Sequence, residues 1–311
     1  MLRISPTLAL IAVLGTAAAP PRAAVQRGSS RLLIDAVAFD RNGVPVVDLK
    51  PEEMEVWIAH FRVPIETFTA VTPGTDQRAG RLTVLLLDDM TLPVPLAGRV
   101  QDVARRFVNR MLPGDRMAIV SLDGSAMELT DDRTRLLRTI DAYGVRSAGL
   151  MPIDRLGEQV LKTVDALSRQ MVEAGPRRKT IVAIGSGWLF DTPIPPPAAG
   201  RDPRREWIAA TQAMALANVS LYVIDPTGVG AARVNGGASG FARDTGGFAF
   251  ISTNDLNGAA DQIMREAANY YLIGVGDPPV GRGADLRELD VRVLRRGVSV
   301  RARRTITGSS I

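Results

Sequence analysis

Residues 81–91, RLTVLLLDDMT, decide the fold class of this chain of 311 residues. The run 82–87 is almost wholly apolar and does not alternate, which is typical of a strand buried on both faces at the centre of a parallel sheet. Asp88 and Asp89 follow immediately, so we expect them at the carboxyl end of that strand. Open α/β sheets bind ligands at this end. The stretch therefore predicts an α/β fold with a candidate site beside the two carboxylates.

Predicted strands and helices alternate from residue 82 onward, and this order favours βαβ units around a mostly parallel central sheet. Apolar residues at helical spacing predict the helices, and short apolar runs predict the strands between them. Thr130 is the expected N-cap of one helix. Strands are expected at residues 117–122, 180–184, 220–224, 248–251 and 270–275, and helices at residues 96–111, 133–143, 154–173, 206–217 and 259–268.

Two β-rich segments flank this region, at residues 31–71 and 286–305. The first predicts a hairpin around Asn42-Gly43 with a return strand at 44–49, because this dipeptide favours tight turns. Residues 72–80 are polar and contain proline and glycine, which indicates a linker.

The C-terminal segment predicts a second hairpin around Arg296-Gly297. Its valines alternate with arginines, so Arg292, Arg301 and Arg303 are expected on a solvated face. Neither flanking segment is large enough to bury a core alone, so we expect the two to pack together as a small β-sandwich-like module.

The N-terminus, residues 1–24, has the pattern of a signal peptide: Arg3, a short apolar segment and then small residues. We expect an exported protein, periplasmic or extracellular, without a membrane span after cleavage, since no other stretch reaches transmembrane length. The absence of cysteine excludes disulfides and thiolate metal sites. Removing Arg3 and Arg22 with the signal lowers the net charge from +5 to +3, which gives no indication of nucleic-acid binding.

The order of several short motifs resembles that of a von Willebrand factor type A (VWFA) domain. They are the strand ending in Asp88, residues 113–116 (PGDR), the strand and turn at 182–187, residues 217–225 (ANVSLYVID) and residues 245–247 (TGG). The chain is more similar still to bacterial VWFA-related proteins of the type known from Acidobacteria, through residues 37–57, residues 269–275 (NYYLIGV) and the basic last strand. The resemblance covers about residues 33–304 and implies a three-layer Rossmann-like VWFA domain at 81–275.

VWFA domains of this kind hold a divalent cation through an Asp-x-Ser-x-Ser loop, a threonine from a second loop and an aspartate from a third. The resemblance therefore implies that a metal, if present, is Mg²⁺ held by Asp88, Asp89 and Thr91, since Mg²⁺ prefers oxygen ligands. Ser147 is the only hydroxyl near the expected place in the second loop.

The metal-binding pattern is incomplete. Counted from Asp88, its serine positions are Met90 and Leu92, whose side chains do not bind a hard cation. The third loop has Gly185 and Ser186 in place of the aspartate, and Asp191 comes several residues later. We therefore expect a degenerate metal site, in which the carboxylates after the first strand cap the following turn or pair with an arginine.

The resemblance and the lack of catalytic groups together predict a non-enzymatic protein that mediates protein–protein interaction or adhesion, with an unknown partner. Two alternatives are a metal-independent structural or assembly subunit of the envelope and a hydrolase acting at Asp88, Asp89 and Ser186. The hydrolase would lack a general base, because the only histidine, His60, falls in the N-terminal β segment. Residues that could form the ligand face are Asp88, Asp89, Thr91, Ser147, Ser186, Trp188 and Asp191.

Overall fold

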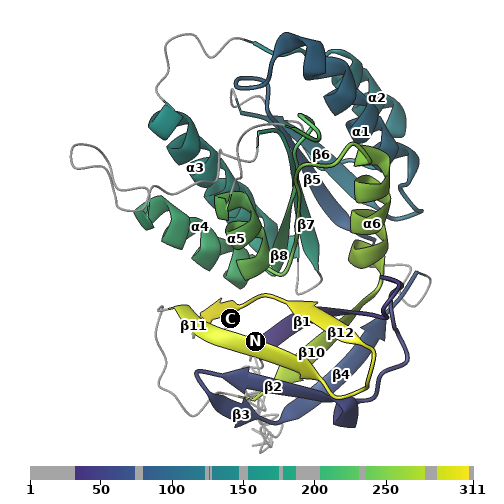
Figure 1. Ribbon diagram of the computed structural model, residues 1–311, viewed down its shortest axis with the longest axis vertical. Coiled ribbons are helices and arrows are strands. Elements are labelled where there is room, and N and C mark those ends of the chain that lie inside the picture. Colours follow the sequence, from purple (N-terminus) through teal and green to yellow (C-terminus); the bar gives the residue numbers. More distant parts are fainter. Residues whose placement is uncertain are drawn as a thin grey trace, which may run out of the picture.

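The chain has an α/β part and a β part, in which the N-terminal and C-terminal strands lie side by side (Figure 1). The structure is a computed structural model. It describes residues 32–73, 80–122, 126, 128–146, 153–174, 178–186, 204–230, 236–276 and 286–307.

The α/β part contains a five-stranded sheet in which all neighbouring strands are parallel. Its order is β6 (Arg116–Ser121), β5 (Leu82–Leu87), β7 (Lys179–Ile184), β8 (Val219–Ile224) and β9 (Ala249–Phe250). Every residue of β5 is buried, as expected from its unbroken apolar run. The predicted α/β class and parallel sheet are confirmed, and the arrangement is compatible with a Rossmann-like fold.

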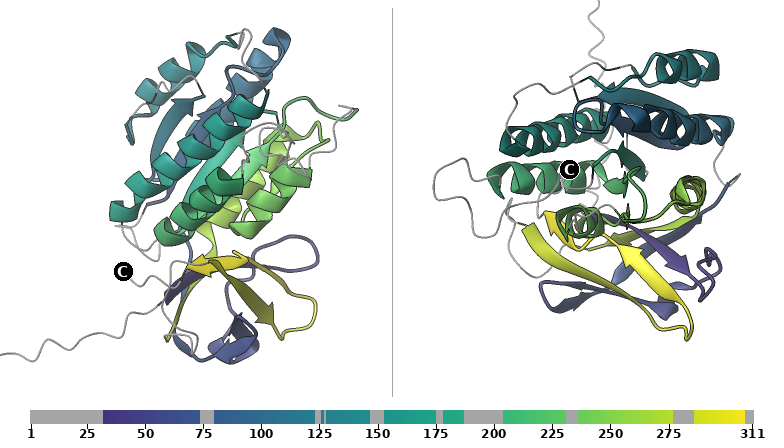
Figure 2. Two further views of the ribbon diagram at one scale, coloured as in Figure 1. Left: turned by 90° about the vertical axis from the view of Figure 1, so that its left-hand side faces the viewer. Right: turned by 45° about the horizontal axis from the view of Figure 1, so that its top comes forward.

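Helices cover both faces of this sheet and make three layers (Figures 1 and 2). One face carries α3 (Ile153–Met171), α4 (Arg204–Ala217) and α5 (Gly236–Asp244), and the other carries α1 (Ala97–Asn109), α2 (Arg133–Asp141) and α6 (Leu256–Ala268). Val84 and Leu86 of β5 pack into the first core, whereas Leu85 and Leu87 pack into the second. Successive side chains of β5 point to opposite faces of the sheet, as expected of a strand, and so contribute to both cores.

The N-cap of α2 differs from the prediction. Asp132, not Thr130, holds this position, and its carboxylate accepts a hydrogen bond from the Arg135 amide at 3.0 Å. The Thr130 hydroxyl instead accepts from the Asp132 amide at 3.1 Å, which fixes the turn before the helix.

The β part contains two antiparallel four-stranded sheets. One has the order β12 (Ser299–Ala302), β1 (Leu32–Phe39), β10 (Tyr270–Val275) and β4 (Ile65–Val71); the other has β13 (Thr305–Thr307), β11 (Leu286–Val293), β2 (Met54–Ile58) and β3 (Phe61–Val63). Apolar side chains from both sheets, such as Ile34, Ile273, Val56 and Leu289, belong to one buried cluster.

Three strand predictions are wrong. Residues 270–275 do not close the parallel sheet, because β10 pairs with β1 and β4. The expected return strand at 44–49 is absent, although Gly43 adopts the predicted turn with φ 74° and Phe39 bridges Pro45. The expected C-terminal hairpin is divided between the sheets, since β11 pairs with β2 and β12 with β1.

The β part meets the α/β part at the amino-terminal edge of the parallel sheet. Arg178, which precedes β7, forms an ion pair with Asp35 of β1, and Arg303 donates to the same carboxylate at 3.0 Å. Asp35, Arg178 and Arg303 are all nearly inaccessible to solvent. Burial and the nearby Arg178 charge lower the pKa of Arg303 to about 9.

A second buried carboxylate extends this contact. Glu266 of α6 accepts hydrogen bonds from Tyr222 at 2.6 Å and from Arg301 of β12 at 2.8 Å. The Tyr222 hydroxyl also accepts from Arg178 at 3.0 Å, which joins the two carboxylates. The prediction of a solvated arginine face is therefore wrong for Arg301 and Arg303. We call Asp35, Arg178, Tyr222, Glu266, Arg301 and Arg303 the interface network.

Candidate functional site

Four of the seven predicted ligand-face residues lie at the carboxyl-terminal edge of the parallel sheet, opposite the β part. Asp88, Asp89 and Thr91 follow β5, and Ser186 follows its neighbour β7. The remaining three, Ser147, Trp188 and Asp191, lie outside the described residues. The structure thus brings together residues almost a hundred positions apart, as the rule for strand ends predicts.

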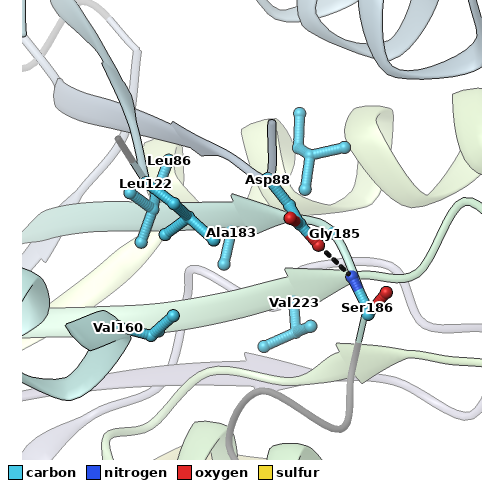
Figure 3. A pocket seen from close by; sticks show the side chains of 9 residues that line it. Leu86, Asp88, Leu122, Val160, Ala183, Gly185, Ser186 and Val223 are labelled. Atoms are coloured by element: carbon cyan, nitrogen blue, oxygen red, sulfur yellow. Dashed lines mark hydrogen bonds between the residues drawn. The ribbon is translucent and has the colours of Figure 1, made fainter. Parts of the chain in front are cut away.

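Asp88 is the centre of this edge. Its Oδ1 accepts hydrogen bonds from the backbone amides of Met90 at 3.2 Å and Thr91 at 2.8 Å. Its Oδ2 accepts from the Ser186 amide at 3.0 Å, the bond drawn in Figure 3, and from the Thr91 hydroxyl. Each carboxylate oxygen therefore has two donors, which fills the acceptor sites of an ionised carboxyl group. Asp88 caps the turn after β5.

Gly185 lies against the Asp88 side chain. A Cβ atom at Gly185 would be 2.3 Å from the Asp88 Cβ and 2.9 Å from its Oδ2. Any larger residue, including the aspartate that VWFA domains carry in this loop, would force the two strand ends apart. The Thr91 and Ser186 hydroxyls lie 3.1 Å apart and complete the contact between the loops.

The loop after α2 covers the carboxylates. Tyr143 donates a hydrogen bond from its hydroxyl to the Asp88 carbonyl at 2.6 Å, and the Arg146 amide donates to the Asp89 carbonyl at 2.5 Å. Burial raises the pKa of Tyr143, and the negative charges of Asp88 and Asp89 raise it further. Sequence reasoning placed Tyr143 at the end of a helix and missed this role, which no local pattern reveals.

A third strand end carries another buried carboxylate, Asp225, which is the last residue of the 217–225 motif. Asp225 follows β8, and its Oδ1 accepts hydrogen bonds from the Thr227 amide at 2.9 Å and the Thr227 hydroxyl at 2.5 Å. Asp225-x-Thr227 therefore repeats the turn capping seen at Asp88. Its signal in the sequence is the same: an acid directly after a buried apolar run.

The cavity beside Asp88 and Ser186 has a volume of only about 10 Å³. Apolar side chains from the core, Leu122, Val160 and Val223 among them, form most of its wall (Figure 3). Such a space holds about one water molecule and no substrate. Among the described residues, this cavity beside Asp88 therefore offers no room for a substrate.

The donor set does not fit the metal site that the resemblance implies. Both oxygens of Asp88 already accept two hydrogen bonds each, and Met90 and Leu92 offer no oxygen side chain. Among the described residues, no group of three or more His, Cys, Asp or Glu side chains is placed to hold a metal ion. We therefore assign no chemical step to a metal here.

Ser186 has no imidazole to activate it. The only histidine of the chain, His60, lies in the turn between β2 and β3, where its side chain is 87% exposed. A serine nucleophile needs a base within hydrogen-bonding reach. Among the described residues, the Ser186 hydroxyl is hydrogen-bonded to the Thr91 hydroxyl, which itself donates to the Asp88 carboxylate.

Two exposed valines lie at this same edge, one at the start of the short helix η2 (Val94–Leu96) and one in a loop. Val94 follows β5 and Val229 follows β8, and each is 68% exposed. Asn254 joins the first turn of α1, a few residues after Val94, to the loop that carries Val229, because its Oδ1 accepts hydrogen bonds from the Arg99 guanidinium and the Val229 amide, both at 3.4 Å. We call the surface around Val94 and Val229 the loop face.

The chain matches no protein-family model and no curated protein. Within the described ranges, no helix has both the length and the apolar character needed to cross a membrane. The geometry of the carboxyl-terminal edge is therefore the main basis for a functional proposal.

Proposed function

We propose that the chain is an exported VWFA-type protein of the bacterial VWFA-related family, which binds a protein partner or mediates adhesion without catalysis and without a metal. The observation that carries this proposal is the carboxyl-terminal edge of the sheet. The polar groups of Asp88, Thr91 and Ser186 are engaged with one another there, while Val94 and Val229 are exposed at the same edge. A rigid α/β scaffold that presents exposed loops is suited to recognition.

The rest of the architecture fits the same proposal. The β part serves as the small β-sandwich-like module, in which N-terminal and C-terminal segments complete each other's sheets. This module occupies the amino-terminal edge and leaves the loop face at the opposite edge. Residues 1–24 would direct export and be removed, so that the mature protein acts in the periplasm or outside the cell.

Metal dependence is tested by calorimetric titration of the mature protein, residues 25–311, with Mg²⁺ and Mn²⁺. We expect no saturable binding at roughly millimolar metal, because Asp88 has no free acceptor site. The control variants are Asp88→Ala and Thr91→Val. Saturable metal binding that Asp88→Ala abolishes would contradict the proposal of metal-independent function and would support a metal-dependent adhesion site.

Partner binding is tested by immobilising the mature protein and capturing proteins from an envelope extract of the source organism, with Mg²⁺ or with EDTA. Val94→Asp/Val229→Asp is expected to lose a captured protein that wild type retains in both conditions. Val44→Asp provides the matched control, since Val44 is 56% exposed but lies in the β part. Equal capture by all variants would contradict the loop face as the binding surface.

A further inference from the structure

A cavity of about 360 Å³ lies where α5 and β9 of the α/β part approach β11 and β12 of the β part. Its volume falls in the range of ligand pockets, and junctions between structural units are frequent places for them. Its wall includes Arg243, Arg301, Arg303 and Arg304, together with Phe248 and Val291. The cavity is distinct from the loop face, which lies at the other edge of the sheet.

Two of these arginines lie on the rim with exposed side chains, Arg243 on α5 and Arg304 after β12. Within the part of the chain that the structure describes, no hydrogen bond or ion pair engages either guanidinium group. The nearby acid is Asp244, on whose carboxyl group both charges act. Burial raises the pKa of Asp244 in spite of the two arginines, and this single carboxyl group faces two guanidinium groups.

Asp290 also lines the cavity, but its carboxylate pairs with Arg292, which is not part of the cavity wall. It accepts a hydrogen bond from the Arg292 Nε at 2.7 Å, on an exposed part of β11. The cavity therefore faces more positive than negative charge.

The interface network, which contributes Arg301 and Arg303 to the cavity wall, has an excess of positive charge. Its three guanidinium groups share two carboxylates, those of Asp35 and Glu266. Arg303 is 3% exposed, and its Nε is buried without a hydrogen-bond partner among the described residues. A buried donor without a partner is costly, as is an excess of buried positive charge, and an anion at the cavity wall would offset the second cost.

Phe248 gives the cavity an apolar wall. Its side chain is 44% exposed, and Arg301 lies over its ring at 5.0 Å. Val291 and Val300 line the same space. A ligand that places a charged group on the arginines can place an apolar group on this wall.

We infer that this cavity binds a small organic anion, with its phosphate or carboxylate group on Arg243 and Arg304 and its apolar part against Phe248. The planar guanidinium group presents paired donors that match the oxygens of both kinds of anion. Arg301 and Arg303, which are fixed by Glu266 and Asp35, supply the positive potential beneath the ligand.

The experiment uses calorimetric titration of the mature protein with phenyl phosphate, with benzoate and with the neutral analogue phenol, at about 0.15 M ionic strength. We expect saturable binding of at least one of the two anions and none of phenol. Arg243→Gln/Arg304→Gln should weaken that binding at least about tenfold, because it removes two charge-assisted contacts. Phe248→Ala should weaken the binding of the same organic anion and leave the binding of inorganic phosphate, titrated in the same way, unchanged.

The matched control is Arg135→Gln/Arg138→Gln, which removes two exposed arginines from α2. This helix packs beside β6, the outer strand farthest from β9 in the sheet. The control variant makes the same change in net charge and should bind the anion as wild type does. Binding of neither anion at about 10 mM would overturn the inference. So would equal weakening by the control variant, equal binding of phenol, or no effect of Phe248→Ala.

Discussion

Gly185 is the residue on which the carboxyl-terminal edge depends most directly. A Cβ there would enter the Asp88 side chain, which is held in place by donors from two loops. We expect Gly185→Ala to lower the free energy of unfolding by about 1–3 kcal/mol, because β5 and β7 must shift to admit the methyl group. Urea denaturation monitored by circular dichroism measures this change.

Gly98 provides the control for this substitution. It lies on the exposed side of α1, and apart from its chain neighbours and the helix's own backbone no atom is within 4 Å of the position its Cβ would take. Gly98→Ala should leave stability unchanged or raise it by up to about 1 kcal/mol, since alanine favours helix. Equal effects of the two substitutions would show that the approach of Gly185 to Asp88 is not tight.

At this scale, the sequence predicts where site residues lie better than what they do. Asp88 and Ser186 are located correctly because an apolar run marks a buried strand and the polar residue after it marks the strand's end. The cover that Tyr143 provides, by contrast, depends on how a distant loop folds over the edge. Similarly, strand alternation separates Arg301 and Arg303 from the valines but does not reveal that the α/β part covers them.

Among the elements, the turn between β11 and β12 is fixed to the short helix η1 (Pro51–Glu53). Arg295 donates to the Glu53 carboxylate from both Nε and Nη2 at 2.7 Å, and to Asp48 at 2.7 Å. The hydrogen bond from Arg295 and that from the Lys50 amide lower the pKa of Glu53 from 4.5 to about 2. This pairing joins segments 242 positions apart in the sequence.

The depressed pKa of Glu53 makes this contact dependent on pH. A carboxyl group whose pKa is lower in the folded state stabilises the fold above its unfolded pKa, and loses that effect as pH falls through its folded pKa. The stability advantage of wild type over Glu53→Gln should therefore be complete above pH 4.5 and disappear toward about pH 2. Urea denaturation at several pH values measures it.

The neighbouring Glu52 is exposed and, in the described part of the chain, makes no ion pair with Arg295, so Glu52→Gln serves as the control. Its stability should follow that of wild type across the same pH range. A difference between wild type and Glu53→Gln that stays constant from pH 5 to about pH 2 would contradict the role of the ion pair.

Element types follow from the sequence more reliably than their partners do. The parallel sheet is predicted because each of its strands is a short apolar run between helices. The hairpins fail because turn signals at Asn42-Gly43 and Arg296-Gly297 specify a change of direction and not the strand that pairs next. β10 joins β1 rather than β9 for a similar reason: its apolar residues suit either sheet, and only the complete β part supplies two antiparallel partners.

In the whole molecule, the two edges of the parallel sheet have different roles. The carboxyl-terminal edge holds the closed Asp88 cluster and the loop face, whereas the amino-terminal edge is attached to the β part through buried charges. The cavity that we assign to an anion lies beside this attachment. Ligand binding there would act on the contact between the two parts, and Asp35 is the residue that both buried arginines share.

Asp35→Asn tests how much the attachment of the two parts depends on this carboxylate. The substitution keeps the shape of the side chain but removes the charge that faces Arg178 and Arg303, and a buried cation without its partner costs about 3–5 kcal/mol. We expect a loss of that size in the free energy of unfolding, measured by urea denaturation. Asp165→Asn breaks the surface pair with Arg169 on α3 and should cost at most about 0.5 kcal/mol. A loss below about 1 kcal/mol for Asp35→Asn would mean that solvent or another anion reaches the arginines, and that the attachment does not depend on their pairing with Asp35.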